Sequence, residues 1–442
     1  MVKVKGGDRM MQRAALAKKL LNGIEKTPTV AVEVGFGAAE ISENRPFVTP
    51  VELWYKNPRL IRAMRACGVC EGQITGEGAD YEKLTALFES LPATAGSTLA
   101  QDLFADLAAL RVPFAPTAKD AASVWQGANT YLASHTVTPR SLLAENRASL
   151  VRVNVGEGCE DSIFEGSVKP LVCFDTLLQI ESPDFSRCVE GLGKSTGIAV
   201  KDLSGLEQAI FATLDRFAAL GACAVMLDLS GFDRFVKTDP YHAALVLARG
   251  LAGENAALTT AEQVLWRVQL LRMLSRAMAV HGMRFVLRVR SKTDHVMGDF
   301  STRAFEKLLL YLSRDRALPT TLLSFAAGDL PRGLSSLLDR FRKEDGTPLL
   351  YFGIDAAGAA SALLSRSLRF YLHRGAASLL LGVTDCEQGC FSAPAKARFA
   401  RVLSAELARF AVTDGNGLFD ESALLRVAQA VFAEQAARFF GV

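Results

Sequence analysis

Charged side chains stand at or just after the ends of several short apolar runs in this chain. Glu33 lies within TVAVEV (29–34), Asp228 lies within CAVMLDL (223–229), and Asp355 directly follows PLLYFGI (348–354). Carboxylates transfer protons, and arginine guanidiniums hold anions through a planar fork. The pattern therefore indicates acid–base chemistry on an anionic ligand. The candidate acid–base residues are Glu33, Asp228, Asp355 and Asp385, and Asn154 and Asp175 are the polar residues at the ends of two further runs. The candidate substrate-binding residues are Arg288 and Arg290, at the end of the run MRFVLRV (283–289).

Histidine is scarce at these positions. Of the five histidines, only His295 follows the end of one of the runs, MRFVLRV (283–289), and we interpret it as a solvated loop residue. Metal sites that activate water are usually built from several imidazoles. The sequence therefore predicts no histidine-built metal centre. The other four histidines are His135, His242, His281 and His373.

Glu33 raises a separate question, because a carboxylate buried in a strand needs a partner. One interpretation is an ion pair with Arg288, whose guanidinium can donate two parallel hydrogen bonds to a carboxylate. The alternative is that Glu33 and Asp385 hold a divalent cation through oxygen ligands. We favour the ion pair and expect no metal and no other cofactor.

The elements that must position these residues are strands alternating with helices. Convincing amphipathic helices, such as residues 206–221 and 261–282, separate the apolar runs. This alternation predicts a parallel sheet, and eight such units predict an α/β (β/α)₈ barrel, whose reacting groups gather at the carboxyl ends of the strands. The eight expected strands are residues 29–34, 149–155, 168–174, 223–229, 283–289, 320–325, 348–354 and 378–383.

The spacing of the expected strands also predicts the organisation of the chain. Residues 1–49 should hold an N-terminal helix and the first strand, and residues 50–148 should form a helical insertion after that strand. Residues 149–442 should complete the barrel and add C-terminal helices.

The composition argues against a nucleic-acid or membrane surface. The chain has 50 basic and 47 acidic residues, a formal net charge of +3. No apolar run reaches the ~20 residues that a membrane span needs. We see no signal peptide, and we interpret the eight cysteines as free thiols in a reducing compartment. These features predict a cytoplasmic protein.

Several segments of the chain resemble the uronate (glucuronate) isomerases of the amidohydrolase superfamily. They are AEISENRPF, IRAMRACGV, ITGEGADYEKL and LPTTLLSF, and their order and spacing match the family nearly end to end. The resemblance implies a distorted (β/α)₈ barrel with a helical insertion. It implies the aldose–ketose isomerisation of D-glucuronate to D-fructuronate, often with a divalent metal. It also implies a sugar-acid ligand and a homo-oligomer.

The resemblance weakens where the family's chemistry should be. The family's His-x-His motif at the end of strand one falls on Glu33 and Gly35, and its strand-five histidine falls on Arg288. The arginine that follows the strand-eight aspartate falls on Glu387, so Asp385 is the one member of the family's metal and acid–base set that is present. A guanidinium cannot ligate a metal and would repel it.

Arg59 replaces another family site residue, in a basic helix that also carries Arg62 and Arg65. Such a helix is most often a solvated face, and the alternative is that Arg59 binds substrate. Three hypotheses follow for the whole chain. It is a homologue that has lost the isomerase chemistry and now binds a ligand or assembles with an active paralogue. It is an enzyme with a rebuilt, histidine-free site that isomerises or epimerises a sugar acid. Or it is an ordinary uronate isomerase.

Overall fold

The computed structural model divides the chain into two compact units. The first contains residues 1–149, 355–370 and 382–436, and the second contains residues 150–354, 371–381 and 437–442. The described residues are 6–25, 27, 29–33, 35–55, 57–94, 98–109, 112, 121–145, 147–157, 160–164, 168–289, 300–315, 318–328, 330–331, 333–338, 340–356, 359–382, 384–385, 393–414 and 419–442.

The second unit is built on a parallel sheet. Its strands follow one another in chain order across the sheet, from β2 to β8. The described pairings between neighbouring strands are parallel. The strands are β2 (Ala148–Asn154), β3 (Lys169–Cys173), β4 (Ala224–Asp228), β5 (Arg284–Val289), β6 (Thr321–Ala326), β7 (Leu350–Asp355) and β8 (Leu380–Leu381).

These strands are apolar on both faces along most of their length. Val172, Leu227 and Leu323 are all fully buried, as expected for parallel strands that are covered on both sides. Near the carboxyl ends of two neighbouring strands, Asp228 of β4 pairs in register with Arg288 of β5. The sheet therefore brings the charged residues of neighbouring strands to one edge.

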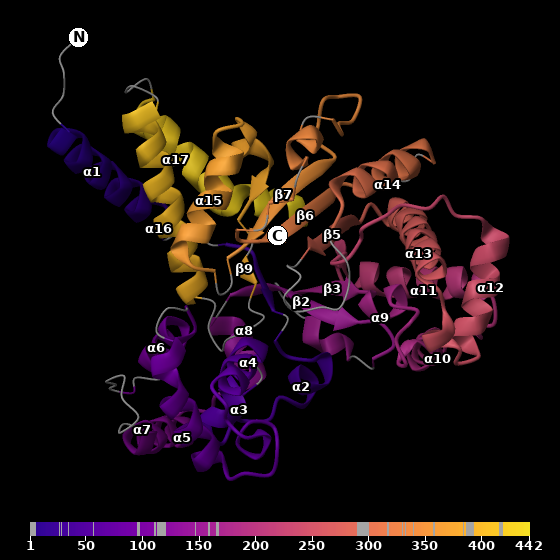
Figure 1. Cartoon of the computed structure of the whole chain (residues 1–442), viewed down its shortest axis with the longest axis horizontal. Helices are drawn as coiled ribbons and strands as arrows, with labels where there is room; N and C mark the ends of the chain where they lie inside the picture. Colours follow the sequence, from indigo (N-terminus) through magenta and orange to yellow (C-terminus); the bar gives the residue numbers. More distant parts are fainter. Residues whose placement is uncertain are drawn as a thin grey trace. The chain divides into compact units, whose positions relative to one another are not determined.

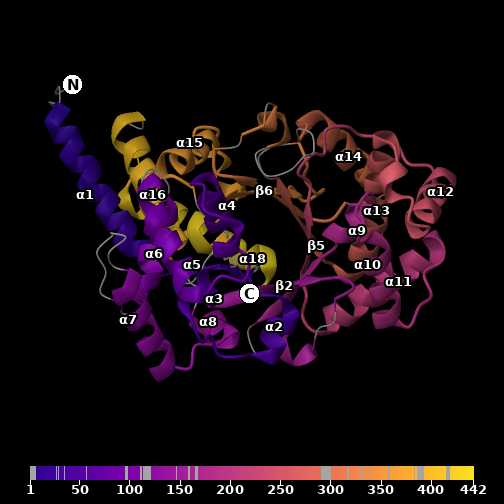
Figure 2. The same cartoon turned by 60° about the horizontal axis from the view of Figure 1, so that its bottom comes forward.

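Helices lie beside this sheet in the second unit. Figures 1 and 2 show α10 to α13 grouped on one side of β5. Helix α13 is largely buried, and its Trp266 is 0% exposed and donates a hydrogen bond to the carbonyl of Leu177 at 2.8 Å. The helices are α9 (Asp175–Leu178), α10 (Phe185–Thr196), α11 (Leu203–Ala219), α12 (Pro240–Leu251), α13 (Thr260–His281) and α14 (Thr302–Arg314).

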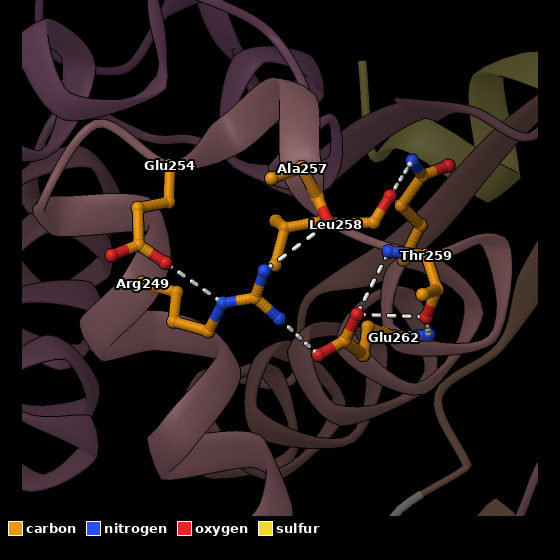
Figure 3. A network of polar contacts seen from close by, with 7 residues as sticks. Arg249, Glu254, Ala257, Leu258, Thr259 and Glu262 are labelled. Atoms are coloured by element: carbon orange, nitrogen blue, oxygen red, sulfur yellow. Dashed lines mark hydrogen bonds and ion pairs between the residues drawn. The ribbon is translucent and has the colours of Figure 1, made fainter.

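A polar network joins α12 to the start of α13 (Figure 3). The guanidinium of Arg249 donates hydrogen bonds to Glu254 at 3.0 Å, to Glu262 at 2.5 Å and to the carbonyl of Ala257 at 3.1 Å. Glu262 also accepts hydrogen bonds from the backbone N–H and the hydroxyl of Thr259, each at 2.7 Å. Thr259 and Glu262 form a capping box that satisfies the first N–H groups of the helix. At the other end Gly282 adopts φ 62°, a left-handed conformation that favours glycine.

The first unit is mainly helical. Its strands β1 (Ala31–Glu33) and β9 (Thr384–Asp385) pair in parallel. Helix α1 packs against α16 and α17, so closely that a Cβ on Gly23 would lie 2.5 Å from Leu425. The helices are α1 (Gly6–Ile24), α2 (Ala38–Glu43), α3 (Pro50–Trp54), α4 (Pro58–Ala66), α5 (Asp80–Ser90), α6 (Thr98–Ala109), α7 (Ala121–Ser134), α8 (Pro139–Glu145), α15 (Ser361–Leu372, whose last two residues belong to the second unit), α16 (Ala393–Arg409) and α17 (Glu421–Gln429).

Each of the eight apolar runs contains a strand, so the predicted strands are confirmed. The last run holds β8, and β9 follows it directly. Residues 206–221 and 261–282 are helical almost as predicted, in α11 and α13. Among the described helices, none combines the length and hydropathy required to span a membrane.

Candidate functional site

The carboxyl ends of β2, β3 and β4 are joined by the carboxylate of Asp175. One of its oxygens accepts a hydrogen bond from the backbone N–H of Asp228 at 2.7 Å. The other lies 3.2 Å from Nη2 of Arg152 on β2. Both oxygens of this carboxylate therefore have partners within the protein. Asp175 thus links the carboxyl ends of three neighbouring strands through these contacts.

Asp228 lies where the sequence predicts it, at the end of β4. Its carboxylate accepts a hydrogen bond from the backbone N–H of Ser230 at 2.8 Å, a local turn contact. The next strand places Arg288 beside it in register, with only 7% of that residue exposed. The structure thus brings together two of the predicted site residues in the second unit, Asp228 and Arg288.

Arg152 was not predicted as a site residue, whereas Asn154 was recognised as the polar residue at the end of its strand. They lie two positions apart on β2 and so share one face of the strand. Nε of Arg152 donates to the side-chain oxygen of Asn154 at 3.0 Å, and the amide of Asn154 donates to Glu157 at 3.1 Å. The signal was present in the sequence, because an arginine and an asparagine alternate with valines in the run SLVRVNV.

The charges in this strand-end cluster influence one another. Burial raises the pKa of the Cys173 thiol well above its ordinary value, and the charge of Asp175 raises it further. Burial alone would lower the pKa of Arg152, but Cys173 and Asp175 outweigh that effect and raise it, while Arg288 opposes them. The thiol is therefore neutral and a poor nucleophile at ordinary pH. Arg152 stays charged.

A second cluster lies in the first unit, around Asp102 of α6. Its carboxylate accepts a hydrogen bond from Nη2 of Arg398 on α16, and Nη2 of Arg59 on α4 lies 3.7 Å from its other oxygen. Nη1 of Arg398 also donates to the carbonyl of Ala356 at 3.5 Å. The charge of Asp355 acts on Arg59. Two further predicted residues, Arg59 and Asp355, thus share an electrostatic environment.

Arg398 and Asp102 were missed by the sequence analysis. They are separated by 296 positions along the chain, and each helix carries at least one other charged residue, so nothing in either sequence distinguishes these two. Only the packing of α6 against α16 brings them together.

Three predicted site residues lie partly or wholly outside the described residues. Glu33 ends β1, and Asp385 pairs in register with Val32 across β1 and β9. Their side chains lie outside the described residues, as does the whole of Arg290. The ion pair between Glu33 and Arg288 therefore stays a prediction, and so does a divalent cation held by Glu33 and Asp385.

The described histidines lie away from both clusters. His135 stacks on Tyr131 at 4.1 Å between ring centroids, His242 contacts Asp239 at 2.7 Å, and Nε2 of His281 lies 3.1 Å from Asp215. His373 is exposed beyond α15, and His295 lies outside the described residues. Within the described part of the chain, no three His, Cys, Asp or Glu side chains are grouped as a metal ion would require.

The strand ends of the second unit do not fit the divalent metal that the family resemblance implies. The strand-five position carries the guanidinium of Arg288, which offers no lone pair to a cation. The neighbouring carboxylates, Asp175 and Asp228, accept hydrogen bonds from backbone N–H groups and from Arg152. These two carboxylates are therefore engaged in contacts within the protein.

Comparison with solved structures identifies the fold. The uronate isomerase of Thermotoga maritima superposes with a TM-score of 0.80 at 19% identity, covering 96% of this chain and 97% of that one. The glucuronate isomerase of Caulobacter crescentus superposes with a TM-score of 0.82 at 16% identity, covering 97% and 94%. The predicted (β/α)₈ barrel is confirmed by this likeness.

Sequence comparison gives the same relatives at low identity. A uronate isomerase of Bacillus pumilus is 22% identical over 352 residues, 77% of this chain and 70% of that protein. One of Pectobacterium atrosepticum is 29% identical over 231 residues, and one of Brachyspira hyodysenteriae is 27% identical over 219 residues. These last two matches span about half the length of those relatives. The family profile described as glucuronate isomerase matches residues 3–440, and the chain therefore belongs to the glucuronate isomerase family.

Proposed function

We propose that this protein is a uronate isomerase homologue that has lost the family's metal-dependent isomerisation and acts as a binding or structural protein. The observation that carries the proposal is the use of both oxygens of Asp175 inside the protein, by Arg152 and by the N–H of Asp228. A general base must instead be free to reach a proton of the substrate. The acid at this strand end holds neighbouring strands together.

The residue types at the barrel's strand ends support the same proposal. Arg288 stands where the resemblance implies a histidine ligand, and its buried guanidinium adds a positive charge. A metal ion at that position would be repelled by the guanidinium and would have one ligand fewer. Isomerisation of an aldose to a ketose by the family's route is then not expected.

An isomerisation assay followed by ¹H NMR tests the proposal. We expect no conversion of D-glucuronate or D-galacturonate, with or without added Zn²⁺ or Mn²⁺. Elemental mass spectrometry should find no stoichiometric divalent metal in the purified protein. Turnover that disappears in the variant Asp385→Asn would overturn the proposal, because it would show that the acid of the family's set still works.

The second candidate function is an enzyme with a rebuilt site, acting on a sugar acid or related polyol. It is favoured by the position of Asp355, an acid at the carboxyl end of β7 whose charge acts on Arg59. In such a pair, Asp355 could act as the general base and Arg59 could bind an anionic group of the substrate. Exchange of substrate C–H protons for deuterium in D₂O would support this candidate if the exchange is lost in Asp355→Asn. The same exchange in the variant would exclude Asp355 as the base.

We propose further that the protein works in the cytoplasm as a homo-oligomer or in assembly with an active paralogue. Measurement of its mass in solution by light scattering, alone and with the paralogue, tests this assembly. A single monomeric species in both samples would contradict it.

A further inference from the structure

We propose that Arg59 and Arg398 form a binding site for the carboxylate of a small organic acid, and that Asp102 fills this site as an internal carboxylate when no ligand is bound. The inference rests on the ligand-binding part of the proposed function. It adds the position of the site and a competing group within the chain.

Arg398 is the more buried of the two arginines in the site. Its side chain is only 7% exposed, and it donates to Asp102 and to the carbonyl of Ala356. A guanidinium is removed from water only when it has acceptors around it. Its fork is therefore held in one orientation, which is the preorganisation that a carboxylate site needs.

Arg59 has hydrogen-bonding capacity that the protein leaves unused. Its Nε is buried and has no hydrogen-bond partner among the described residues. Its Nη2 lies 3.7 Å from Asp102, which is longer than a hydrogen bond. A buried donor without an acceptor costs free energy that a ligand oxygen could recover. Arg59 thus has donors ready for a further oxygen atom.

The electrostatic environment of Arg59 also favours an additional anion. Burial lowers the pKa of its guanidinium, as do the charges of Arg398 and Arg62, although Asp102 and Asp355 act in the opposite direction. Burial, the largest of these effects, therefore outweighs the two carboxylates. A bound carboxylate would offset it, because a nearby negative charge favours the charged form of the guanidinium.

The position of Arg59 in its helix points the same way. It is the second residue of α4, and its backbone N–H donates to the capping side chain of Asn57 at 2.9 Å. The start of a helix is its positive end, where cationic side chains are unfavourable and anions are stabilised. An anion bound near Arg59 would therefore be stabilised both by the guanidinium and by the start of the helix.

Asp102 has the properties of an internal substitute for the ligand. Its two oxygens face the two arginines, as the two oxygens of a bound carboxylate would. It comes from α6, a helix different from those that carry the arginines. A ligand carboxylate would therefore compete with Asp102 for the same forks, and removal of the charge of Asp102 should strengthen ligand binding.

Isothermal titration calorimetry on the full chain at low ionic strength tests the inference. The probes are D-glucuronate and, as the matched neutral sugar, D-glucose. We expect Arg59→Gln to weaken binding of D-glucuronate about tenfold, the effect of one lost charge-assisted hydrogen bond. We expect Asp102→Asn to strengthen it by a similar factor and D-glucose not to bind.

Two further variants control for folding and for general charge. Arg65→Gln removes an exposed arginine of the same helix that pairs with Glu71, and it should leave the affinity unchanged. Arg398→Lys keeps the charge of the buried residue while it removes the fork, and it should weaken binding like Arg59→Gln. The melting midpoint of every variant is measured first, so that only folded protein is titrated.

Two results would overturn the inference in distinguishable ways. If D-glucuronate binds wild type, Arg59→Gln and Asp102→Asn equally well, the site lies elsewhere, although the proposed binding function stands. If neither wild type nor Asp102→Asn binds D-glucuronate, D-galacturonate or citrate, both the site and the binding function fall. The loss of isomerisation is judged separately, by the NMR assay.

Discussion

The carboxylate of Asp175 accepts a hydrogen bond from the backbone N–H of Asp228 at a distance of 2.7 Å. This contact joins the residue that follows β3 to the last residue of β4, and the ion pair with Arg152 extends it to β2. An acid at the carboxyl end of a barrel strand is normally read as catalytic. Here its hydrogen bonds give it a structural role as well, and that role can be measured.

Asp175→Ala should lower the free energy of unfolding by about 2 kcal/mol. The substitution leaves the N–H of Asp228 without its acceptor and Arg152 without its ion pair, and each loss costs on the order of 1 kcal/mol or more at a partly buried site. Asp175→Asn keeps an acceptor for the N–H and should cost less. The midpoint of urea unfolding measures both.

The surface pair of Glu190 and Lys194 supplies the control for this experiment. Both side chains are well exposed, so Glu190→Ala should change the free energy of unfolding by less than about 0.5 kcal/mol. Equal effects of Asp175→Ala and Glu190→Ala would show that Asp175 does not hold the strands together. Asp175 would then be available for catalysis.

The sequence predicts the scaffold of this site better than the site itself. All eight strands and their order could be predicted, because a run such as CAVMLDL is apolar, short and bounded by helices. The placement of Asp228 and Arg288 at strand ends follows from the same pattern. The pattern of each run indicates which residue lies at the strand end. A parallel barrel then places the carboxyl ends of neighbouring strands side by side.

The contacts made by helices could not be predicted in this way. Asp102 and Arg398 lie 296 positions apart, and nothing in either helix indicates that the two side chains meet. Their pairing depends on the packing of α6 against α16, which is a tertiary property. Asp175 is an intermediate case. Its position after a strand could be predicted, because it directly follows the run VKPLVCF, but its hydrogen bond with the N–H of Asp228 could not.

Glu406 makes the stability of the first unit depend on pH. Burial alone would raise the pKa of this carboxyl, but hydrogen bonds from Arg369, Ser365 and Arg409 outweigh it and lower the pKa from 4.5 to about 2. A depressed pKa in the folded state contributes stability above the unfolded pKa, and that contribution is lost as the pH falls toward about 2. Glu406→Gln should therefore be destabilising by about 2 kcal/mol near neutral pH.

The pH dependence of the difference between wild type and Glu406→Gln checks this explanation. The difference should stay constant from about pH 7 to about pH 5 and shrink as the pH falls further. Urea unfolding at each pH gives the measurement, and Glu421→Gln, which removes an exposed partner of Lys19, is the control. A difference that does not change down to about pH 3 would contradict the role of the charge.

Thr259 caps α13, the buried helix of the second unit. Thr259→Ala removes the hydroxyl that accepts from the N–H of Glu262 and donates to its carboxylate, and it should cost about 1 kcal/mol. Thr259→Ser keeps these hydrogen bonds and should restore most of the stability. Thermal unfolding of the three proteins measures the effect. Equal destabilisation by alanine and serine would show that the methyl group, and not the cap, matters.

The reactivity of the cysteines reports whether solvent reaches the strand-end cluster. Cys67 and Cys70 are exposed, whereas Cys173 is buried beside Asp175 with a raised pKa, and burial raises the pKa of Cys188 to about 12. Iodoacetamide reacts with the thiolate, so Cys67 and Cys70 should be alkylated in the native protein, and Cys173 and Cys188 only after unfolding. Mass spectrometry of the peptides measures each site. Rapid alkylation of Cys173 in the native protein, with Cys188 still protected, would show that small molecules reach the ends of β2 to β4. That result would favour the enzyme with a rebuilt site over a homologue whose strand ends are closed.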